Sequence, residues 1–269
     1  MLFYRAFLLM LLLANPCGAS YISLGATITS PQLVTEQSFI VNATVMNSGD
    51  EEAREVQLDI LLPDGFFAQP AYLGALQPNV PYFAAFNVTV ADYVKPGTYP
   101  LFVKNHYADS NAYPFSTLLQ TLIRYRQPAP VRMRGSIRDL TLSSSGGEEK
   151  DLVIEVSNLD DRPHRLALKL QLPDELKAKF YSTELDLGAR DYGSVSVPIR
   201  ALGALPQSTY LVFASLEYED GKLHFGSAAS GVVKVVAEEG EVAGETTSYL
   251  PAAAIGVLLL VLVYHQIKK

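Results

Sequence analysis

The sequence predicts an all-β protein of two tandem antiparallel β-sandwiches followed by one C-terminal transmembrane helix. Three observations support this prediction. A strand–turn–strand pattern occurs twice, about 111 residues apart, and the region between two terminal apolar runs shows period-two hydrophobic alternation without convincing helical periodicity. The second apolar run carries no charge over most of its length, as a membrane span requires.

The strand–turn–strand pattern spans residues 39–64 and recurs at residues 151–174. Each copy has an alternating strand, an acidic turn led by Asn, a second alternating strand and the tripeptide Leu-Pro-Asp. Anchor residues repeat at 110 to 114 residues along the whole copy: Asn47 and Asn158, Pro63 and Pro173, Gly74 and Gly188, and Tyr99 and Tyr210. Self-similarity at domain length indicates two copies of one domain, each long enough to bury its own core.

Residues 1–19 have the composition of a secretory signal peptide. Arg5 precedes the apolar run 6–14, and small residues stand before the expected cleavage at Ser20. An uncleaved anchor is disfavoured because the run is too short to cross ~30 Å of hydrocarbon. A lipoprotein site at Cys17 is the other alternative, but the residues before it are not the small ones that such a site prefers. Cleavage removes the only cysteine, so core burial must hold the exported chain together.

The two predicted sandwiches cover residues 20–125 and 137–236. In both, Gly, Pro, Asn and Asp turns divide about seven short strands. The clearest inward-facing series are Val56, Leu58, Ile60 and Leu62, then Tyr82, Ala84, Phe86, Val88 and Val90, and in the second copy Leu166, Leu168, Leu170 and Leu172. Recurring Asn and Gly are expected in left-handed turn conformations, and Leu-Pro ends strands because proline cannot donate to the ladder. Tyr99 and Tyr210 are expected to be corner tyrosines that bond a nearby backbone group.

The segment 126–136 is the expected linker, and its prolines favour an extended, semi-rigid spacer. Arginines gather around it: Arg124, Arg126, Arg132, Arg134 and Arg138. We expect these side chains either to pair with acidic loops or stay solvated, or to bind an anionic partner, for which Arg126, Arg132 and Arg134 are the candidate contacts. Residues 237–248 carry four acids and form the expected solvated stalk.

Residues 249–267 form the expected transmembrane helix, with a tyrosine at each edge of its uncharged run and two lysines behind it. The lysines place residues 268–269 in the cytoplasm and the sandwiches outside the cell membrane, as a single-pass protein. Two alternatives remain. Leu250-Pro251 matches the start of an LPxTG sorting signal but departs from it at the Thr and Gly positions, and the run could instead form a buried soluble helix.

The balance of charge argues against some partners. Of the 21 basic residues, Arg5, Lys268 and Lys269 lie in the terminal segments, whereas all 28 acids lie between them. The middle region therefore has 18 basic residues and a net charge of −10. Nucleic acid and anionic lipid both need a basic footprint, so we expect a protein or a cell-surface glycan as the partner and no nucleic acid.

Each copy resembles the bacterial and archaeal Ig-like modules known as cell-adhesion-related (CARDB-type) domains and the related galactosidase-associated Ig-like domain. The segments that carry the resemblance are 45–50, 62–65, 73–74 and 96–99 in the first copy, and 158–161, 172–174, 187–188 and 206–210 in the second. The second copy has Gln207 in place of Gly97. The resemblance covers about residues 20–236 and implies two tandem Ig-like sandwiches. Such modules serve as stalks, adhesive units and enzyme accessories, so the resemblance implies no single function.

No catalytic residue, cofactor or metal site is predicted. The histidines of the middle region, His106, His164 and His224, lack zinc-ligand spacing. The acidic turns at 50–52 and 160–161 lack the alternating pattern of a calcium loop, so polar turns are the better interpretation. Carboxylate pairs for glycoside hydrolysis have little support because the acids of the two copies do not match. We therefore expect a non-enzymatic protein.

Two features remain as candidate sites. Phe66, Phe67 and Tyr72 crowd a loop bounded by Pro and Gly; if exposed, these rings could stack on sugars, whereas buried rings would cap their own sandwich. Asn42 and Asn87 begin Asn-x-Thr sequons on the outward side of their strands, so both are candidate glycosylation sites. The expected function is that of a structural or interaction protein of the cell envelope, with a carbohydrate-binding surface protein and an accessory subunit of a membrane complex as alternatives.

Overall fold

The structure, a computed structural model, describes residues 21–237. The expected signal peptide (1–19), most of the stalk (238–248), the transmembrane segment (249–267) and residues 268–269 lie outside the described residues. Every regular element between residues 21 and 237 is a β-strand, which confirms the all-β prediction. That part of the chain contains no helix long and apolar enough to cross a membrane.

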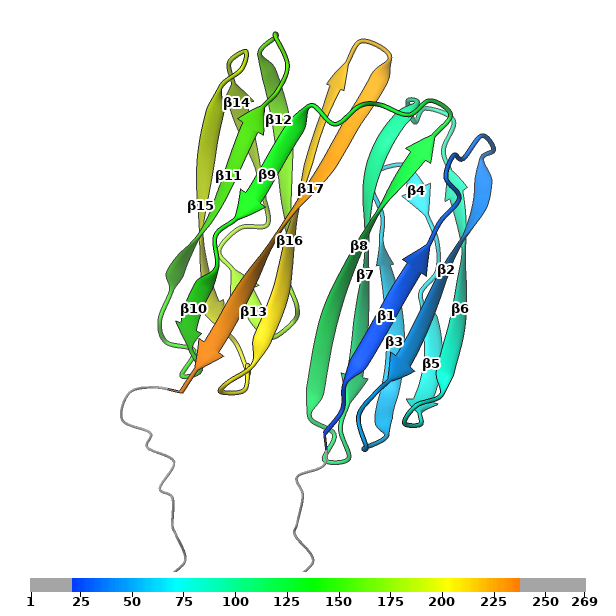
Figure 1. Cartoon of the computed structure of the whole chain (residues 1–269), viewed down its shortest axis with the longest axis vertical. Helices are drawn as coiled ribbons and strands as arrows, with labels where there is room; N and C mark the ends of the chain where they lie inside the picture. The colour runs from blue at the N-terminus through cyan, green and yellow to red at the C-terminus, as the bar shows by residue number, and fades with distance from the viewer. Residues whose placement is uncertain (1–20, 238–269) are drawn as a thin grey trace, which may run out of the picture.

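The first sandwich has two antiparallel sheets (Figure 1). One sheet has the order β1-β2-β6-β4, and its strands are β1 Leu24–Thr29, β2 Ser38–Asn47, β6 Pro81–Val90 and β4 Phe66–Phe67. The other has the order β5-β3-β7-β8, and its strands are β5 Ala71–Leu76, β3 Ala53–Leu61, β7 Gly97–Ala108 and β8 Pro114–Tyr125. A parallel bridge between Val34 and Tyr125 ties the start of the chain to β8.

The second sandwich repeats this topology, except that the strand β10 stands where the first sandwich has the single bridge at Val34. Its first sheet has the order β9-β11-β15-β13, and its strands are β9 Met133–Ile137, β11 Lys150–Asn158, β15 Tyr192–Ala201 and β13 Leu176–Ala178. Its second sheet has the order β14-β12-β16-β17, and its strands are β14 Ser182–Leu187, β12 His164–Gln171, β16 Thr209–Asp220 and β17 Leu223–Val236, with β10 Leu140–Ser143 parallel to β17. Both halves are Ig-like β-sandwiches. Strand β9 begins inside the segment that was expected to be linker.

The predicted period-two alternation appears as alternating burial. In β2, Val41 and Val45 are fully buried, while Ile40 and Asn42, which flank Val41, are exposed. Because apolar side chains from both sheets point inward, each sandwich has its own hydrophobic core, one around Leu58 and one around Leu168. Core burial at this scale is what stabilises a domain that has no disulfide.

The repeated asparagines are buried hydrogen-bonding residues. The side-chain amide of Asn47 donates to the carbonyl of Glu51 at 2.6 Å, and that of Asn158 donates to the carbonyls of Arg162 and Gly188, both at 2.8 Å. Neither asparagine has a left-handed backbone, so the expected reason for their recurrence was wrong. Each residue holds a turn closed by satisfying buried backbone groups, which would otherwise cost free energy.

The corner prediction is confirmed for Tyr99, whose hydroxyl donates to the Lys95 carbonyl at 2.6 Å. Tyr210 is buried near the start of β16, as Tyr99 is near the start of β7, and burial raises the pKa of the Tyr210 hydroxyl. The bond of Tyr99 fixes the turn before β7, which also faces the second sandwich.

The two sandwiches pack side by side and not end to end (Figure 1). Phe102 of β7, Leu118 of β8 and Phe213 of β16 form a small apolar cluster between them. At one end the amide of His224 in β17 donates to the Pro96 carbonyl at 2.9 Å, which joins the two sandwiches by a backbone hydrogen bond. Both ends of the described chain lie at the opposite end of the body from the connection between β8 and β9 (Figure 1).

The connection is bound to the first sandwich. The backbone nitrogen of Ala129 donates to the Thr98 hydroxyl at 3.1 Å, and that hydroxyl donates to the Ala129 carbonyl at 3.0 Å. Ala129 is buried as a result. The segment therefore does not hold the sandwiches apart as the expected extended spacer would, because the chain turns back and the second sandwich lies beside the first.

Candidate interdomain binding cleft

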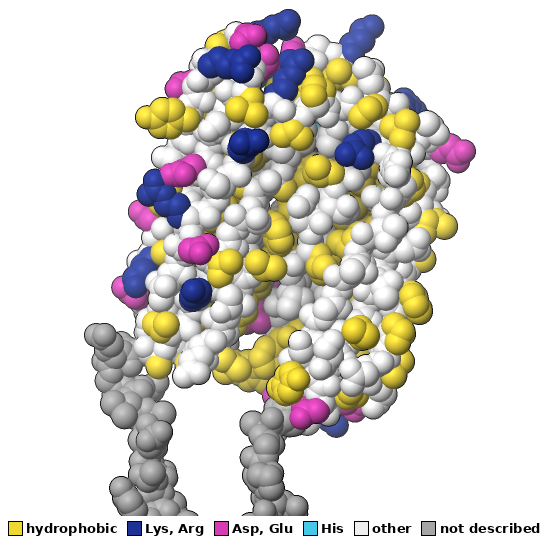
Figure 2. Space-filling model, in the orientation of Figure 1, with side chains coloured by type: hydrophobic (Ala, Val, Ile, Leu, Met, Phe, Trp, Pro, Cys, Tyr) yellow, Lys and Arg dark blue, Asp and Glu magenta, His cyan; other side chains and the backbone are white. Residues whose placement is uncertain are grey.

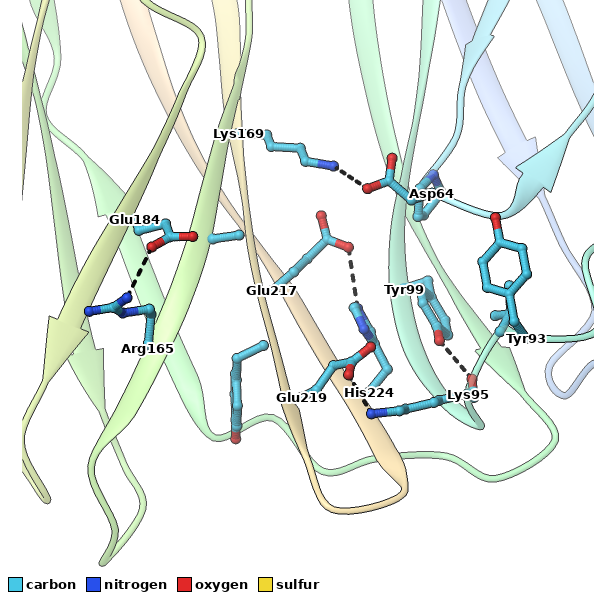
Figure 3. Close-up of a pocket in the computed structure, with 14 residues that line it drawn as sticks. Asp64, Tyr93, Lys95, Tyr99, Arg165, Lys169, Glu184, Glu217, Glu219 and His224 are labelled. Atoms are coloured by element: carbon cyan, nitrogen blue, oxygen red, sulfur yellow. Dashed lines mark hydrogen bonds and ion pairs between the residues drawn. The ribbon is translucent and has the colours of Figure 1, made fainter.

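A cleft of about 340 Å³ opens where the two sandwiches meet (Figure 3). The first sandwich contributes the turn after β3, the turn before β7 and Tyr99 of β7, and the second contributes β12, β14, β16 and β17. Its charged and aromatic side chains are Asp64, Tyr93, Lys95, Tyr99, Arg165, Lys169, Glu184, Glu217, Glu219 and His224. Strand periodicity places them, since Glu217 and Glu219 alternate with a buried tyrosine and so share one face of β16.

The centre of the cleft is the stack of Tyr99 on His224. Their ring centroids are 4.0 Å apart and the planes differ by 7°. The His224 Nε2 lies 3.2 Å from a Glu217 carboxylate oxygen, an ion-pair distance without hydrogen-bond geometry. Burial raises the pKa of Tyr99, and the charges of Glu219 and Glu217 raise it further, so its hydroxyl stays protonated as the donor to Lys95.

The charges that line the cleft are paired with one another. Lys95 meets Glu219, the Lys169 Nζ lies 3.2 Å from a carboxylate oxygen of Asp64, and Arg165 lies 3.5 Å from Glu184. Two of these three pairs join one sandwich to the other. In water such exposed pairs contribute little individually, about 0–1 kcal/mol, so their main effect is to orient the two surfaces.

The arrangement does not form a nucleophile and base. Ser215 donates its hydroxyl proton to Glu217 at 2.8 Å and not to His224, so no serine is activated by the imidazole. Among residues 21–237 no three His, Cys, Asp or Glu side chains are grouped so that they could hold a metal ion. The pairs Lys95–Glu219 and Lys169–Asp64 cross the cleft and so hold its two walls together.

A second polar cluster lies further along the interface. Both carboxylate oxygens of the buried Glu175 accept hydrogen bonds from Ser116, one from its amide and one from its hydroxyl, each at 2.7 Å. The two ring nitrogens of His106 lie 2.9 Å from Asp59 and from Asp174. The Leu-Pro-Asp segment of the second copy thus docks on the first sandwich.

The sequence prediction missed this docking role because the role of Leu-Pro-Asp in ending a strand already accounts for its recurrence. The available signal was a difference between the copies: Asp174 is followed by Glu175, whereas its counterpart Asp64 is followed by Gly65. A carboxylate added next to a turn in only one copy has no role in the shared fold. Such a residue is a candidate for contact between the copies.

The three predicted aromatic residues do not come together. Phe66 is 4% exposed and packs on Tyr99 with ring centroids 4.9 Å apart, so it is a core residue and not a contact residue. Phe67 is 58% exposed on β4, and Tyr72 is 70% exposed on β5. Because β4 and β5 belong to opposite sheets, the expected aromatic cluster does not exist.

The predicted arginines have different environments. Arg132 donates to Asp160 at 2.6 Å and lies over the ring of Phe225, so the pairing interpretation holds for it. Arg126 lies over the ring of Tyr125 and is exposed, as is Arg134 on β9. Of the five arginines around the linker, Arg124, Arg126, Arg134 and Arg138 are exposed, and Arg138 pairs with Glu155.

Both sequon asparagines, Asn42 on β2 and Asn87 on β6, are exposed. They lie on the same outer face of the sheet β1-β2-β6-β4, because Asn42 pairs with Ala85 and Asn87 pairs with Ile40. The Ser38 hydroxyl donates to the Asn87 side chain at 2.9 Å. The prediction of accessible side chains agrees with this geometry.

Comparison with protein-family models and with curated protein sequences gives no match. Similar solved structures include trypsin-activated α-2-macroglobulin from Escherichia coli, with 12% identity and a TM-score of 0.34 over 80% of this chain and 18% of that one. A protein of unknown function from Porphyromonas gingivalis W83 has 16% identity and a TM-score of 0.33 over 78% and 99%. The Salmonella enterica SafA pilin in complex with the SafB chaperone has 12% identity and a TM-score of 0.28 over 41% and 57%. The chain spans less than a fifth of the α-2-macroglobulin chain. Identities and TM-scores this low indicate nothing about function.

Proposed function

We propose that this chain is a membrane-anchored, extracytoplasmic and non-enzymatic module of the cell envelope, in which two CARDB-type Ig-like sandwiches form one rigid body that presents a surface to a partner. The observation that carries the proposal is the interface between the sandwiches. It combines the backbone bond from His224 to Pro96, the Tyr99 stack and the buried Glu175. Contacts that bury and satisfy backbone and carboxylate groups resist hinge motion.

The non-enzymatic part of the proposal is supported by the pairing of the ionisable side chains in the cleft. Lys95, Lys169 and Arg165 each face a carboxylate of the cleft, and Glu217 accepts from Ser215. The pairs formed by Lys95 and Lys169 cross the interface and position the two surfaces, whereas a general acid or base has to reach a substrate atom. A rigid scaffold needs these ion pairs only to hold the two sandwiches together.

The envelope location comes from the terminal sequence. Residues 1–19 are the proposed signal and residues 249–267 the proposed span. Since both ends of the described chain lie at one end of the body, a membrane anchor after β17 would place that end toward the bilayer (Figure 1). The connection between β8 and β9, with Arg126 beside it, would then face away from the membrane.

Protease protection tests the location. Full-length chain carrying an epitope tag after Lys269 is expressed in its own cells, and intact cells are treated with a protease. The sandwiches should be lost while a small tagged fragment remains protected, because only the C-terminal end is inside. Full protection of the whole chain, or loss of the tag in intact cells, would contradict the proposed topology. Cross-linking intact cells with the same tag then identifies the partner.

A carbohydrate partner is the second candidate, and the exposed ring of Phe67 is the observation that favours it. Phe66 is in the core and Tyr72 is on the opposite sheet, so the loop as a unit cannot form the site. If a sugar binds, its site has to be built on the face that carries Phe67.

A further inference from the structure

The outer face of the sheet β1-β2-β6-β4 carries no charged side chain among the described residues, and we refer to it as the neutral face. Its outward positions follow from strand alternation and register. They are Gly25, Thr27, Thr29, Ser38, Ile40, Asn42, Thr44, Met46, Phe67, Pro81, Phe83, Ala85, Asn87 and Thr89. In Figure 2 charged side chains gather at the upper end of the body and over the second sandwich, while the middle of the first shows mainly hydrophobic and uncharged atoms.

The second sandwich provides an internal comparison. Asn47 ends β2 as Asn158 ends β11, and Met46 pairs with Pro81 as Ser157 pairs with Tyr192, so the two outer faces correspond position by position. Six positions that are uncharged in the first sandwich are charged in the second: Gly25 and Arg134, Thr29 and Arg138, Ile40 and Asp151, Thr44 and Glu155, Phe67 and Lys177, and Thr89 and Arg200. The fold therefore tolerates charges here, and charges would protect a flat sheet from association.

The neutral face also exposes large rings. Phe83 is 74% exposed and Phe67 58%, values that no folding requirement explains because neither ring contributes to the core. Phe67 is paired with Thr89, which is six residues along β6 from Phe83. At about 3.4 Å per residue the two rings stand roughly 20 Å apart along the strand direction. Asn42 and Asn87 lie between them and offer amide donors and acceptors.

We propose that the neutral face binds a linear, neutral polysaccharide that runs along β6 from Phe83 to Phe67. Ring faces attract the C–H edges of sugars, and the amides and hydroxyls between the rings suit a chain of hydroxyl groups. An anionic polymer would find no cation on the neutral face, because the six positions that are charged in the second sandwich are uncharged in the first. A protein partner would favour one contiguous apolar centre, whereas the large apolar residues here fall at the two ends of β6, with Pro81 and Phe83 at one end, Phe67 at the other and Asn42 and Asn87 between them. The inference rests on the proposed function, because an exported body is the one that meets surface glycan.

The test uses the full-length chain in detergent, produced in a host without N-glycosylation so that Asn42 and Asn87 stay unmodified. Its retention is measured by affinity electrophoresis and pull-down on cellulose, chitin and mannan, with polygalacturonate as the anionic comparison. Phe83→Ser introduces the residue that the second sandwich has at this position, Ser194, so the fold is expected to accept it. Thr89→Arg likewise copies Arg200, and Tyr192→Ala removes an 83% exposed ring from the equivalent face of the second sandwich as the matched control.

We expect retention on at least one neutral polysaccharide, at least tenfold weaker binding by both neutral-face variants, unchanged binding by the Tyr192 variant, and no dependence on salt. The proposal is overturned if none of the three polysaccharides retains the wild type, or if Phe83→Ser binds as the wild type does. It is also overturned if sedimentation shows that the same substitutions abolish self-association without glycan, because the face would then bind a second copy. Protease protection in cells is independent of these measurements, so a wrong location and a wrong ligand give different results.

Discussion

Gly226→Ala is predicted to separate the two sandwiches without unfolding either. Gly226 lies in β17, and a Cβ added there would stand 2.5 Å from the Thr98 carbonyl oxygen and 2.6 Å from Pro100 Cδ. Both of these atoms belong to the first sandwich, so the methyl group fits the second sandwich once the two have separated. Contacts this short do not occur, so β17 has to move away from β7.

The expected loss follows from what that movement breaks. The bond from the His224 amide to the Pro96 carbonyl contributes about 1 kcal/mol, and the stack of Tyr99 on His224 contributes about 1 kcal/mol. Together these amount to about 2 kcal/mol, which is a loss of about 30-fold in the equilibrium for docking. The loss of these two contacts leaves each core intact, because the core residues lie inside the separate sandwiches.

Hydrogen exchange of the full-length chain measures this opening. The amides of His224 and Ser116 are both bonded across the interface and should exchange about 30-fold faster in the variant, while amides inside the two cores keep their rates. Gly147→Ala is the matched control, because a Cβ there meets no atom within 4 Å. Gly231→Ala is the second control, since its methyl group would strike Ile137 within the second sandwich and should destabilise that core instead.

The reasoning is refuted if Gly226→Ala leaves both interface amides as protected as in the wild type. Faster exchange spread over all core strands would also refute it, because the substitution would then unfold a sandwich and not open the interface. The reciprocal variant Gly97→Ala, whose Cβ would meet the backbone of His224, should reproduce the result from the other side.

Asn47→Ala should lower the free energy of unfolding by about 2–3 kcal/mol in urea titration, because buried turn carbonyls lose their donor; a change below about 0.5 kcal/mol would contradict the bonding role. The hydrogen bond from His164, helped by Arg132, holds the pKa of Asp160 at about 2, below its ordinary value, so its stabilisation is present above about pH 4 and is lost as the pH falls toward 2. Thermal melts between pH 5 and 2 should therefore decline less steeply in Asp160→Asn, and identical slopes would exclude this coupling. Phe66→Ala should cost about 3–5 kcal/mol, whereas Phe67→Ala should stay within about 0.5 kcal/mol; equal losses would place both rings in the core.

Strand positions could be predicted because one physical cause dominates them. Val41 and Val45, or Leu166 and Leu168, are buried since a sheet with one face on a core repeats every two residues. The corner role of Tyr99 was predictable because its hydrogen bond is local, to a residue four positions earlier in the chain. The packing of one sandwich on the other depends on contacts across the whole chain, so prolines in the connecting segment suggested a spacer where the chain in fact turns back.

The candidate sites were harder to predict because exposure depends on which sheet a loop residue joins. Phe66 and Phe67 are neighbours in sequence, yet alternation sends one ring into the core and the other to the neutral face. Phe83 lies between Tyr82 and Ala84 of the predicted inward-facing series, so alternation predicts an outward ring there. The sequence alone does not show that this ring shares a face with Phe67 and the two asparagines, because that depends on the pairing of β6 with β2 and β4.

The differences between the two copies separate fold from function more sharply than the motifs they share. Asn47 and Asn158 are the same because both turns need the same buried amide. Two of the differences between the copies fall on two separate surfaces. Glu175 in place of Gly65 belongs to the interface that joins the sandwiches, and Phe67 in place of Lys177 belongs to the neutral face. Interface positions are constrained by the other copy within this chain, so the neutral face, which faces no part of the described chain, is where the constraint has to come from a partner.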